Sequence, residues 1–290
     1  MSSYSYDFSG KVAIVTGAGS KQSMGRAIAM DLARQGAWVV VSDKYLVPPT
    51  VRESNKDWGG LGEIVKDIEK LGSRALAVEC DIGVPEACEA LVEKTMDAFG
   101  KLDFFVNSVG LRGPSGLLVE DLTPDMWKSV LDANLNGAFF LSKYVVKAMK
   151  KDEPRGKKIV FIASQAGVEG VPGLSAYSTA KHGVLGLMKS LAKEVAPIGI
   201  NVNAISPMTF ETNFRDQTAA EEAAKKGMSL DEMIRTDNIS RGTGANNMSV
   251  PLGRNGTVDD AAAMISFLLS PGADYLAAQN ILMNGGNMTL

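Results

Sequence analysis

The stretch KVAIVTGAGSKQSMGRAIAMDLARQ (residues 11–35) joins an apolar run to a glycine-rich turn and then to a segment of helical periodicity. The run 11–16 is apolar almost throughout, which is typical of a strand buried on both faces. Gly17, Gly19 and Gly25 surround the turn, where glycine lets backbone N–H groups approach a pyrophosphate and the helix N-terminus adds unpaired donors. Three glycines are weak evidence alone, but the strand before them and the helix after them give the context that a dinucleotide site requires.

The same alternation of short apolar runs and longer helical segments continues along the chain. Further strands are predicted at 37–42, 75–80, 102–107, 158–164, 200–206 and 279–284. Alternation of this kind predicts an α/β fold: a Rossmann-like, doubly wound parallel sheet of about seven strands with helices on both faces, in three αβα layers. Residues 1–290 are expected to form a single domain with insertions at 44–60 and 208–250. The Met- and Phe-containing second insertion is predicted to be a substrate lid, with ordinary helix packing as the alternative.

Composition excludes several classes of protein. The 290 residues carry a formal net charge of −3, so no overall basic field attracts nucleic acid or anionic lipid. Cys80 and Cys88 lack disulfide or zinc spacing, and no His/Asp/Glu cluster suggests a catalytic metal. The N-terminus has no apolar signal region and no run is long enough for a membrane helix, so we expect a cytoplasmic protein without a membrane partner.

Asp43 ends the second apolar run, eighteen residues after Gly25. A carboxylate at this point can accept hydrogen bonds from both hydroxyls of an adenosine ribose, and it repels a 2′-phosphate. The alternative is an aspartate that caps a helix or a turn. Lys44 is adjacent, and its cation could attract a phosphate. The sequence therefore favours NAD over NADP as the cofactor.

Tyr177 and Lys181, in the segment SAYSTAKHG, are four residues apart and share one face of a predicted helix. Their stripe continues through apolar residues: Val184, Met188, Leu191 and Val195. A buried lysine is costly unless its charge has a use, although it could also extend to water from the end of the stripe. An ammonium about 5 Å away would stabilise a phenolate by roughly 3 kcal/mol, which corresponds to about two pKa units. The spacing thus predicts that Tyr177 exchanges protons at a substrate oxygen, because a positive nicotinamide ring would lower its pKa further.

Two polar residues are predicted to complete the catalytic site. Ser164 ends the run 158–164, and the carboxyl ends of parallel strands are where ligands bind in this architecture. Its hydroxyl could hold the substrate oxygen near Tyr177. Asn134 shares an otherwise apolar stripe with Val130 and Leu141, so its buried amide needs partners. It could hold a water or a backbone group linked to Lys181, or it could be a purely structural asparagine.

Together these residues resemble the short-chain dehydrogenase/reductase family over essentially the whole chain. The resemblance implies a catalytic tetrad of Asn134, Ser164, Tyr177 and Lys181, with Lys181 also binding the nicotinamide ribose. It also implies cofactor contacts, which would come from Gly17, Gly19, Ser23, Met24, Gly25, Asp43, Asp81, Ile82, Asn107, Gly110, Tyr177, Lys181, Pro207, Met208 and Thr212. Relatives pair their long helices, here 124–150 and 176–196, so a homodimer or homotetramer is expected.

The chain departs from the family pattern in three places, of which one is NSVG (107–110) in place of the usual NNAG. The glycine turn contains two extra residues, Lys21 and Gln22, and Ser23 stands at the position of the middle glycine. The usual Pro-Gly after the sixth strand is Pro207-Met208. These differences affect the residues that are expected to bind the pyrophosphate and to lie over the nicotinamide. All four residues of the tetrad are present.

Three functions agree with these observations. The first is an NAD-dependent dehydrogenase or ketoreductase that acts on a secondary alcohol or ketone, with an apolar or cyclic small-molecule substrate. The second is a reductase of 3-oxoacyl thioesters, which would use NADPH and is disfavoured by Asp43. The third is a dinucleotide-binding sensor without turnover. The sensor is suggested by the altered glycine turn and disfavoured by the intact tetrad.

Overall fold

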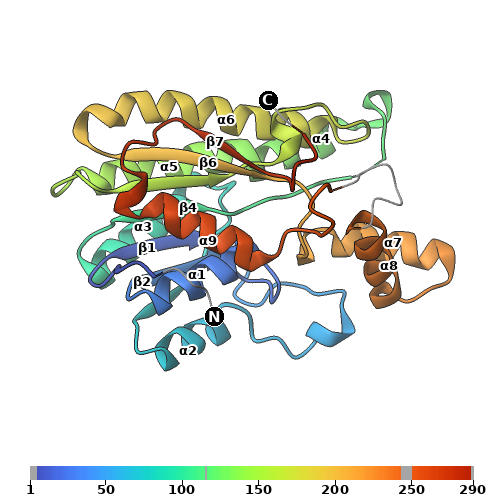
Figure 1. Ribbon diagram of the computed structural model, residues 1–290, viewed down its shortest axis with the longest axis horizontal. Helices are drawn as coiled ribbons and strands as arrows, with labels where there is room; N and C mark the ends of the chain where they lie inside the picture. Colours follow the sequence, from blue (N-terminus) through green and yellow to red (C-terminus); the bar gives the residue numbers. More distant parts are fainter. Residues whose placement is uncertain (1–4, 115, 243–249, 289–290) are drawn as a thin grey trace.

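A computed structural model describes residues 5–114, 116–242 and 250–288 (Figure 1). Within these residues, seven parallel strands form one sheet in the order β3-β2-β1-β4-β5-β6-β7. The strands are β1 (Val12–Thr16), β2 (Trp38–Asp43), β3 (Ala75–Glu79), β4 (Phe104–Asn107), β5 (Lys158–Ile162), β6 (Asn201–Pro207) and β7 (Asn280–Met283). Each strand overlaps one predicted run, so the predicted Rossmann-like sheet is confirmed.

Helices cover both faces of the sheet because successive strand residues point to opposite sides. Ala13 and Val15 pack on the face covered by α1 (Met24–Arg34), α2 (Gly60–Lys70) and α9 (Val258–Leu269). Ile14 packs on the other face, against α3 (Pro85–Phe99), α5 (Gly137–Met149) and α6 (Ser175–Val195). The helix α4 (Pro124–Leu131) continues into α5 through the π-helical turn η3 (Asp132–Asn136). Four short 3₁₀ turns connect other elements: η2 (Val119–Asp121), η4 (Gln165–Gly167), η5 (Ala196–Ile198) and η7 (Pro271–Ala273).

The insertion 44–60 folds back onto the glycine turn. It contains the short turn η1 (Glu53–Asn55) and the buried Trp58. The indole Nε1 of Trp58 donates to the carbonyl oxygen of Gly19 at 2.6 Å, and the Arg26 guanidinium lies 5.0 Å from the centre of the Trp58 ring. The insertion therefore braces the turn between β1 and α1.

The second insertion, 208–250, contains η6 (Asn213–Arg215), α7 (Asp216–Lys226) and α8 (Leu230–Gly242), while 243–249 lie outside the described residues. The two helices pack on each other through a small core of their own, which includes Ala219, Ala223 and Met233. They project from one end of the sheet (Figure 1). Among the described helices, none is both long enough and apolar enough to span a bilayer.

Candidate active site

Two glycines of the turn between β1 and α1, Gly17 and Gly25, have no room for a side chain. A Cβ on Gly17, whose φ is +68°, would lie 2.6 Å from the carbonyl oxygen of Ser108. A Cβ on Gly25 would lie 2.5 Å from the carbonyl oxygen of Gly17. Backbone thus packs on backbone at the N-terminus of α1, which presents the donors and positive dipole end that a pyrophosphate requires. The residues present fit a dinucleotide.

Ser23, which replaces the expected glycine, caps α1. Its hydroxyl accepts a hydrogen bond from the amide of Arg26 at 3.1 Å and donates to the carbonyl oxygen of Ala18 at 3.1 Å. Serine is a favoured N-cap residue for this reason. Met24 and Gly25 follow as the first residues of the helix, where backbone N–H groups have no partner within the helix. The side chain of Ser23 therefore stabilises the turn, and the N–H groups at the start of α1 stay available to a ligand.

Asp43 lies at the carboxyl end of β2, directly against the glycine turn. Its carboxylate accepts hydrogen bonds from the amides of Gly19, at 2.8 Å, and Lys44, at 2.7 Å. Burial raises the pKa of Asp43, while these two amides lower it. Each carboxylate oxygen has a second lone pair available for a hydroxyl donor. The ammonium of Lys44 is directed to Asp81, with 2.8 Å between Nζ and Oδ2.

Ser164, Tyr177 and Lys181 meet beyond the end of β5. Tyr177 and Lys181 are buried one turn apart on α6, on the predicted stripe, and the ammonium lies 5.7 Å from the centre of the phenol ring. The ammonium donates to the carbonyl oxygens of Ile162, at 3.0 Å, and Val109, at 3.4 Å. Ser164 is hydrogen-bonded to Tyr177 through its side chain, and it also accepts from the amide of Ala166 at 3.2 Å.

In the chain without cofactor, the pKa of Tyr177 lies above its ordinary value, which is opposite to the lowering that the sequence predicts for the working site. Burial raises the pKa of Tyr177 to about 12, although the hydrogen bond with Ser164 and the nearby charge of Arg112 oppose this shift. Burial also lowers the pKa of Lys181 to about 8. Loss of hydration disfavours the charged form of both groups, and it is the largest cause of each shift. The free site therefore holds a neutral phenol.

Asn134 lies in η3, where the π-helical turn directs its amide toward the segment 109–111. Its Nδ2 donates to the carbonyl oxygens of Leu111 and Val130, both at 2.8 Å, and its Oδ1 accepts from the amide of Leu111 at 3.2 Å. Because Val109 accepts a hydrogen bond from Lys181, Asn134 and Lys181 hold the same segment from two sides. The link between Asn134 and Lys181 is made here by backbone.

The other predicted cofactor residues surround the ends of β1, β3 and β4. Asn107 accepts from the Thr16 hydroxyl at 3.1 Å, which joins β4 to β1 at the edge of the site. Gly110 lies next to Lys181, since a Cβ added to it would be 3.8 Å from the ammonium nitrogen. Ile82 is buried against Gly137 and follows Asp81 at the end of β3. Their roles in binding stay predictions.

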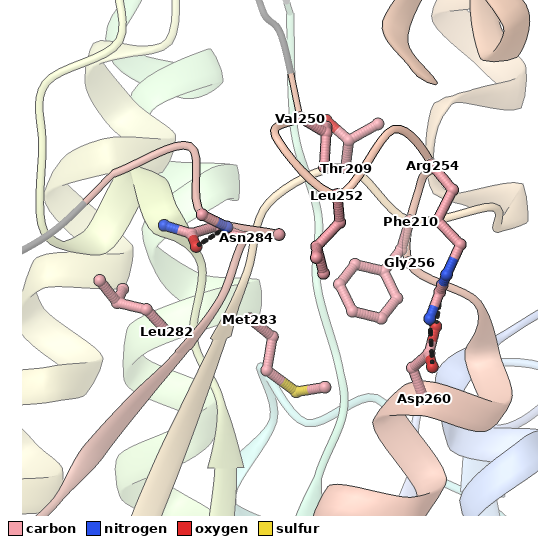
Figure 2. Close-up of a pocket in the computed structure, with 12 residues that line it drawn as sticks. Thr209, Phe210, Val250, Leu252, Arg254, Gly256, Asp260, Leu282, Met283 and Asn284 are labelled. Carbon is pink, nitrogen blue, oxygen red and sulfur yellow. Dashed lines mark hydrogen bonds and ion pairs between the residues drawn. The ribbon is translucent and has the colours of Figure 1, made fainter. Parts of the chain in front are cut away.

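The residues after β6 lie beside a separate cavity. Pro207 ends β6, and the amide of Met208 donates to the carbonyl oxygen of Met283 at 3.1 Å, which ties this loop to β7. Thr212 caps η6 by accepting from the amide of Phe214 at 3.3 Å. Figure 2 shows the cavity, which has a volume of about 360 Å³. Its lining residues are Thr209, Phe210, Val250, Leu252, Arg254, Gly256, Asp260, Leu282, Met283, Asn284, Gly285 and Gly286. None of the four predicted tetrad residues lines it.

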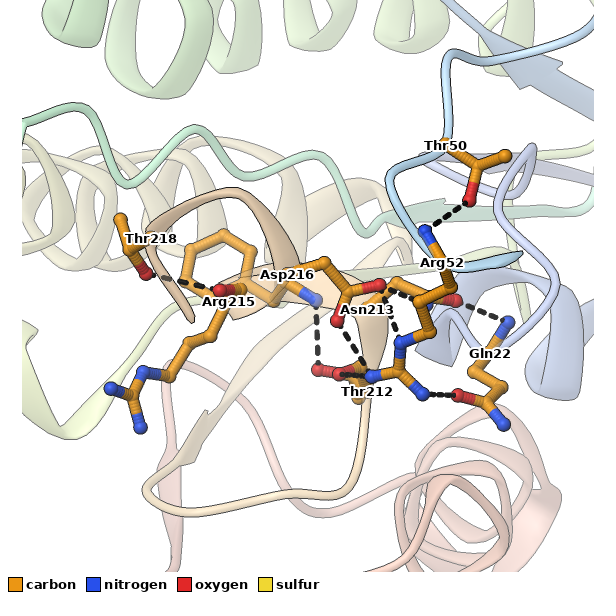
Figure 3. A network of polar contacts seen from close by, with 9 residues as sticks. Gln22, Thr50, Arg52, Thr212, Asn213, Arg215, Asp216 and Thr218 are labelled. Atoms are coloured by element: carbon orange, nitrogen blue, oxygen red, sulfur yellow. Dashed lines mark hydrogen bonds and ion pairs between the residues drawn. The ribbon is translucent and has the colours of Figure 1, made fainter. Parts of the chain in front are cut away.

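Sequence reasoning missed two side chains near the site. The Phe214 ring lies 5.8 Å from the Tyr177 ring, centre to centre. Arg52, from the insertion 44–60, forms a two-pronged ion pair with Asp216 at the start of α7 (Figure 3). The aromatic content of 208–250 pointed to Phe214 in general terms. No local pattern identified Arg52. In the part of the chain that the structure describes, no cluster of His, Cys, Asp and Glu could hold a metal ion.

Comparison with known proteins agrees with this geometry. A family model described as enoyl-(acyl carrier protein) reductase matches residues 17–288. A 3β-hydroxysteroid dehydrogenase from Mediterraneibacter gnavus is 33% identical, covering 97% of this chain and 96% of the relative. A cyclohexanol dehydrogenase from an Acinetobacter species is 33% identical, covering 96% and 95%. A 3-oxoacyl-[acyl-carrier-protein] reductase from a Synechocystis species is 32% identical, covering 95% and 96%.

Solved structures also match over almost the whole chain. Levodione reductase superimposes with a TM-score of 0.81 at 28% identity, covering 96% of this chain and 98% of that protein. NAD⁺-bound xylitol dehydrogenase superimposes with a TM-score of 0.78 at 29% identity, covering 97% and 100%. Both proteins are named as oxidoreductases, one of them with its dinucleotide bound.

Proposed function

Because the chain belongs to the short-chain dehydrogenase/reductase family, we propose that it is an NAD-dependent enzyme that interconverts an apolar or cyclic secondary alcohol and its ketone. The observation that carries the proposal is the grouping of the buried Tyr177 and Lys181 with the half-buried Ser164 beyond the end of β5. A bound dinucleotide supplies or accepts the hydride. The protein must then hold the substrate oxygen and move one proton to or from it.

The three side chains divide this work. Tyr177 is neutral in the free site, so it gives its proton to the carbonyl oxygen during reduction and takes a proton from the hydroxyl during oxidation. Ser164, hydrogen-bonded to Tyr177, holds the same oxygen in place. Lys181 and Asn134 fix the backbone of 109–111 beside them, and Lys181 is also the residue that would hold the nicotinamide ribose.

The proposal of NAD over NADP is supported by Asp43. Its carboxylate lies at the glycine turn, and the nearest cation on the same loop, Lys44, is paired with Asp81. A 2′-phosphate at this position would meet the negative charge of Asp43. The structurally similar xylitol dehydrogenase, which holds NAD⁺, supports this choice.

Ring-bearing substrates are supported by the surroundings of Tyr177 and by the relatives. The phenol packs in an apolar cluster with Val130, Ala166, Ala176 and Ala180, and Phe214 lies beside it. Two of the relatives are named for a hydroxysteroid and for cyclohexanol, which are alcohols on rings. The second candidate is the reduction of a 3-oxoacyl thioester, which the Synechocystis relative favours. The same tetrad would serve that reaction, and the cofactor preference distinguishes the two.

The test is a panel of ring and open-chain secondary alcohols and ketones, followed at the NADH absorbance band with NAD(H) and with NADP(H). We expect turnover of ring substrates with NAD(H). The variant Tyr177→Phe should lose about 100- to 10,000-fold in kcat, because it lacks the proton donor. It should still bind NAD in a calorimetric titration. Full activity in this variant would exclude the proposed role, and a preference for NADPH with 3-oxoacyl thioesters would favour the second candidate.

We also propose a homo-oligomer in which the face of α4 and α5 is covered. Phe139 on α5 is 50% exposed, and Met126 and Trp127 on α4 are exposed as well. Contiguous exposed apolar side chains of this size are typical of subunit contacts. The predicted pairing of the segments 124–150 and 176–196 would bury them.

A further inference from the structure

We propose that Phe214 is the residue that selects ring-shaped apolar substrates, and that an ion pair between Arg52 and Asp216 positions it. The inference rests on the proposed function, because it concerns the substrate side of the same site. Phe214 comes from the second insertion, whereas Arg52 comes from the first. The two insertions therefore meet at this ion pair.

The Phe214 ring borders the proposed catalytic pair, Tyr177 and Lys181. Its ring lies 5.8 Å from the Tyr177 ring at an angle of 45°. Its edge also lies at Gly110, where an added Cβ would be 3.1 Å from Cε2 of Phe214 and 3.8 Å from the ammonium of Lys181. The side chain is nevertheless 41% exposed. An apolar ring with a free surface beside the proton donor is therefore available to a substrate.

Arg52 holds the backbone on both sides of Phe214. Its guanidinium contacts Asp216 through two hydrogen bonds, Nε to Oδ2 at 2.7 Å and Nη2 to Oδ1 at 2.6 Å. The same Nη2 donates to the carbonyl oxygen of Thr212 at 3.3 Å. Both side chains of the ion pair are only 10% exposed. The contacts therefore fix the chain two residues before and two residues after Phe214 in a site with little water.

Gln22, one of the two extra residues in the glycine turn, ties the same segment from another side. Its amide donates to Oδ1 of Asn213 at 2.7 Å, and the amide of Asn213 donates to its carbonyl oxygen at 3.1 Å. Its side-chain oxygen accepts from Arg52 (Figure 3). Since α7 and α8 have a core of their own, these ties at the base determine where Phe214 lies relative to Tyr177.

The surface of the Phe214 ring favours a cyclic substrate over an open-chain substrate. A flat ring packs on phenylalanine as a rigid body, and contacts of this type increase binding by roughly threefold to tenfold. An open chain with the same number of carbons loses rotational freedom when it is ordered against the same surface. We therefore expect the ratio of kcat/KM for a ring ketone to that for its open-chain analogue to depend on Phe214.

The test measures this ratio for the best ring substrate of the panel and an open-chain analogue with equal carbon number. Phe214→Ala should lower the ratio about threefold to tenfold, and Phe214→Leu should lower it less. Arg52→Ala should lower it in the same way, and Arg52→Lys should restore only part of it because an ammonium lacks the two-pronged geometry. If Arg52 acts through Phe214, then Arg52→Ala should cause no further change in the Phe214→Ala background.

Arg254→Ala is the control. Arg254 also makes a two-pronged ion pair, with Asp260 at 2.6 and 3.0 Å, and it lies outside both insertions. This variant should leave the ratio unchanged. The charge-swapped pair Arg52→Asp with Asp216→Arg should recover part of the ratio that Arg52→Ala loses. Turnover with an unchanged ratio in Phe214→Ala would overturn this inference alone, whereas absence of turnover in the wild-type chain across the panel would overturn the proposed function.

Discussion

At the scale of single residues, Tyr177 and Lys181 show how burial governs a catalytic pair. Both side chains are buried within one turn of α6, and each is driven toward its neutral form. Lys181 keeps two carbonyl partners, Ile162 and Val109, which limit the cost of its burial. In the chain without cofactor, burial of these two groups therefore lowers the stability of the fold. Such a cost is common for residues that are kept for function and not for packing.

The pKa of Lys181 leads to a prediction about stability. Between its folded value of about 8 and its ordinary value of 10.5, the unfolded chain binds a proton that the folded chain does not. The free energy of unfolding should therefore rise with pH, by about 2 kcal/mol between pH 7.5 and 9.5. Urea titrations of the wild type and Lys181→Met at several pH values would measure this, because the variant should lack the rise. Tyr177 acts in the opposite direction only above pH 10. Parallel pH profiles for the two chains would contradict the prediction.

Asp43 is the residue whose charge should decide between the two dinucleotides. In Asp43→Asn an oxygen remains to accept from the Gly19 amide, so the turn is preserved while the charge is removed. We expect the ratio of kcat/KM for NADP to that for NAD to rise at least tenfold, since repulsion of the 2′-phosphate is lost. Asp67→Asn, which removes a carboxylate paired with Lys70 and Arg26, serves as the control. An unchanged ratio in Asp43→Asn would remove the basis for proposing NAD.

At the scale of elements, the unit of β1, turn and α1 depends on close backbone packing. Gly17 is required by its positive φ as well as by space, whereas Gly25 is required by space alone. The cap by Ser23 and the hydrogen bond from Trp58 to Gly19 hold the same turn from two sides. The altered glycine turn is thus stabilised by contacts from Ser23 and Trp58.

Gly25→Ala tests this packing. Its Cβ would lie 2.5 Å from the Gly17 carbonyl oxygen, so α1 must shift. We expect a loss of about 1–3 kcal/mol in the free energy of unfolding and weaker dinucleotide binding, measured by urea titration and calorimetry. Gly62→Ala in α2 is the control, because its Cβ would meet nothing within 4 Å. Alanine there should stabilise the chain by up to about 1 kcal/mol. Unaltered stability and dinucleotide binding in Gly25→Ala would show that the turn is looser than the structure indicates.

At the scale of the whole molecule, the sheet places the proposed dinucleotide-binding and catalytic residues along one edge, at the carboxyl ends of the strands. β1, β2 and β3 bring Gly17, Asp43 and Asp81 to that edge, and β5 leads to Ser164. The two insertions extend beyond it and meet through Arg52 and Asp216. On the helical face opposite α1 and α9, the exposed Phe139 lies on α5 (Figure 1).

Phe139→Glu tests whether this face joins subunits. A charge buried in an apolar contact is costly, so the variant should shift to a smaller assembly than the wild type. Light scattering coupled to size-exclusion chromatography measures the mass. Tyr275→Glu is the control, because Tyr275 is fully exposed and lies on the turn between η7 and β7. An unchanged mass for Phe139→Glu would exclude α5 as the contact.

The sequence by itself determined the fold class, the position of the seven strands and the pairing of Tyr177 with Lys181, since these follow from local periodicity and spacing. Only the tertiary structure decided the direction of the Tyr177 pKa, because it depends on how completely other elements exclude water from the phenol. The same holds for the ion pair of Arg52 with Asp216, which joins residues 164 positions apart. No periodic pattern encodes a contact at that separation. The ion pair forms because the fold brings the two insertions together.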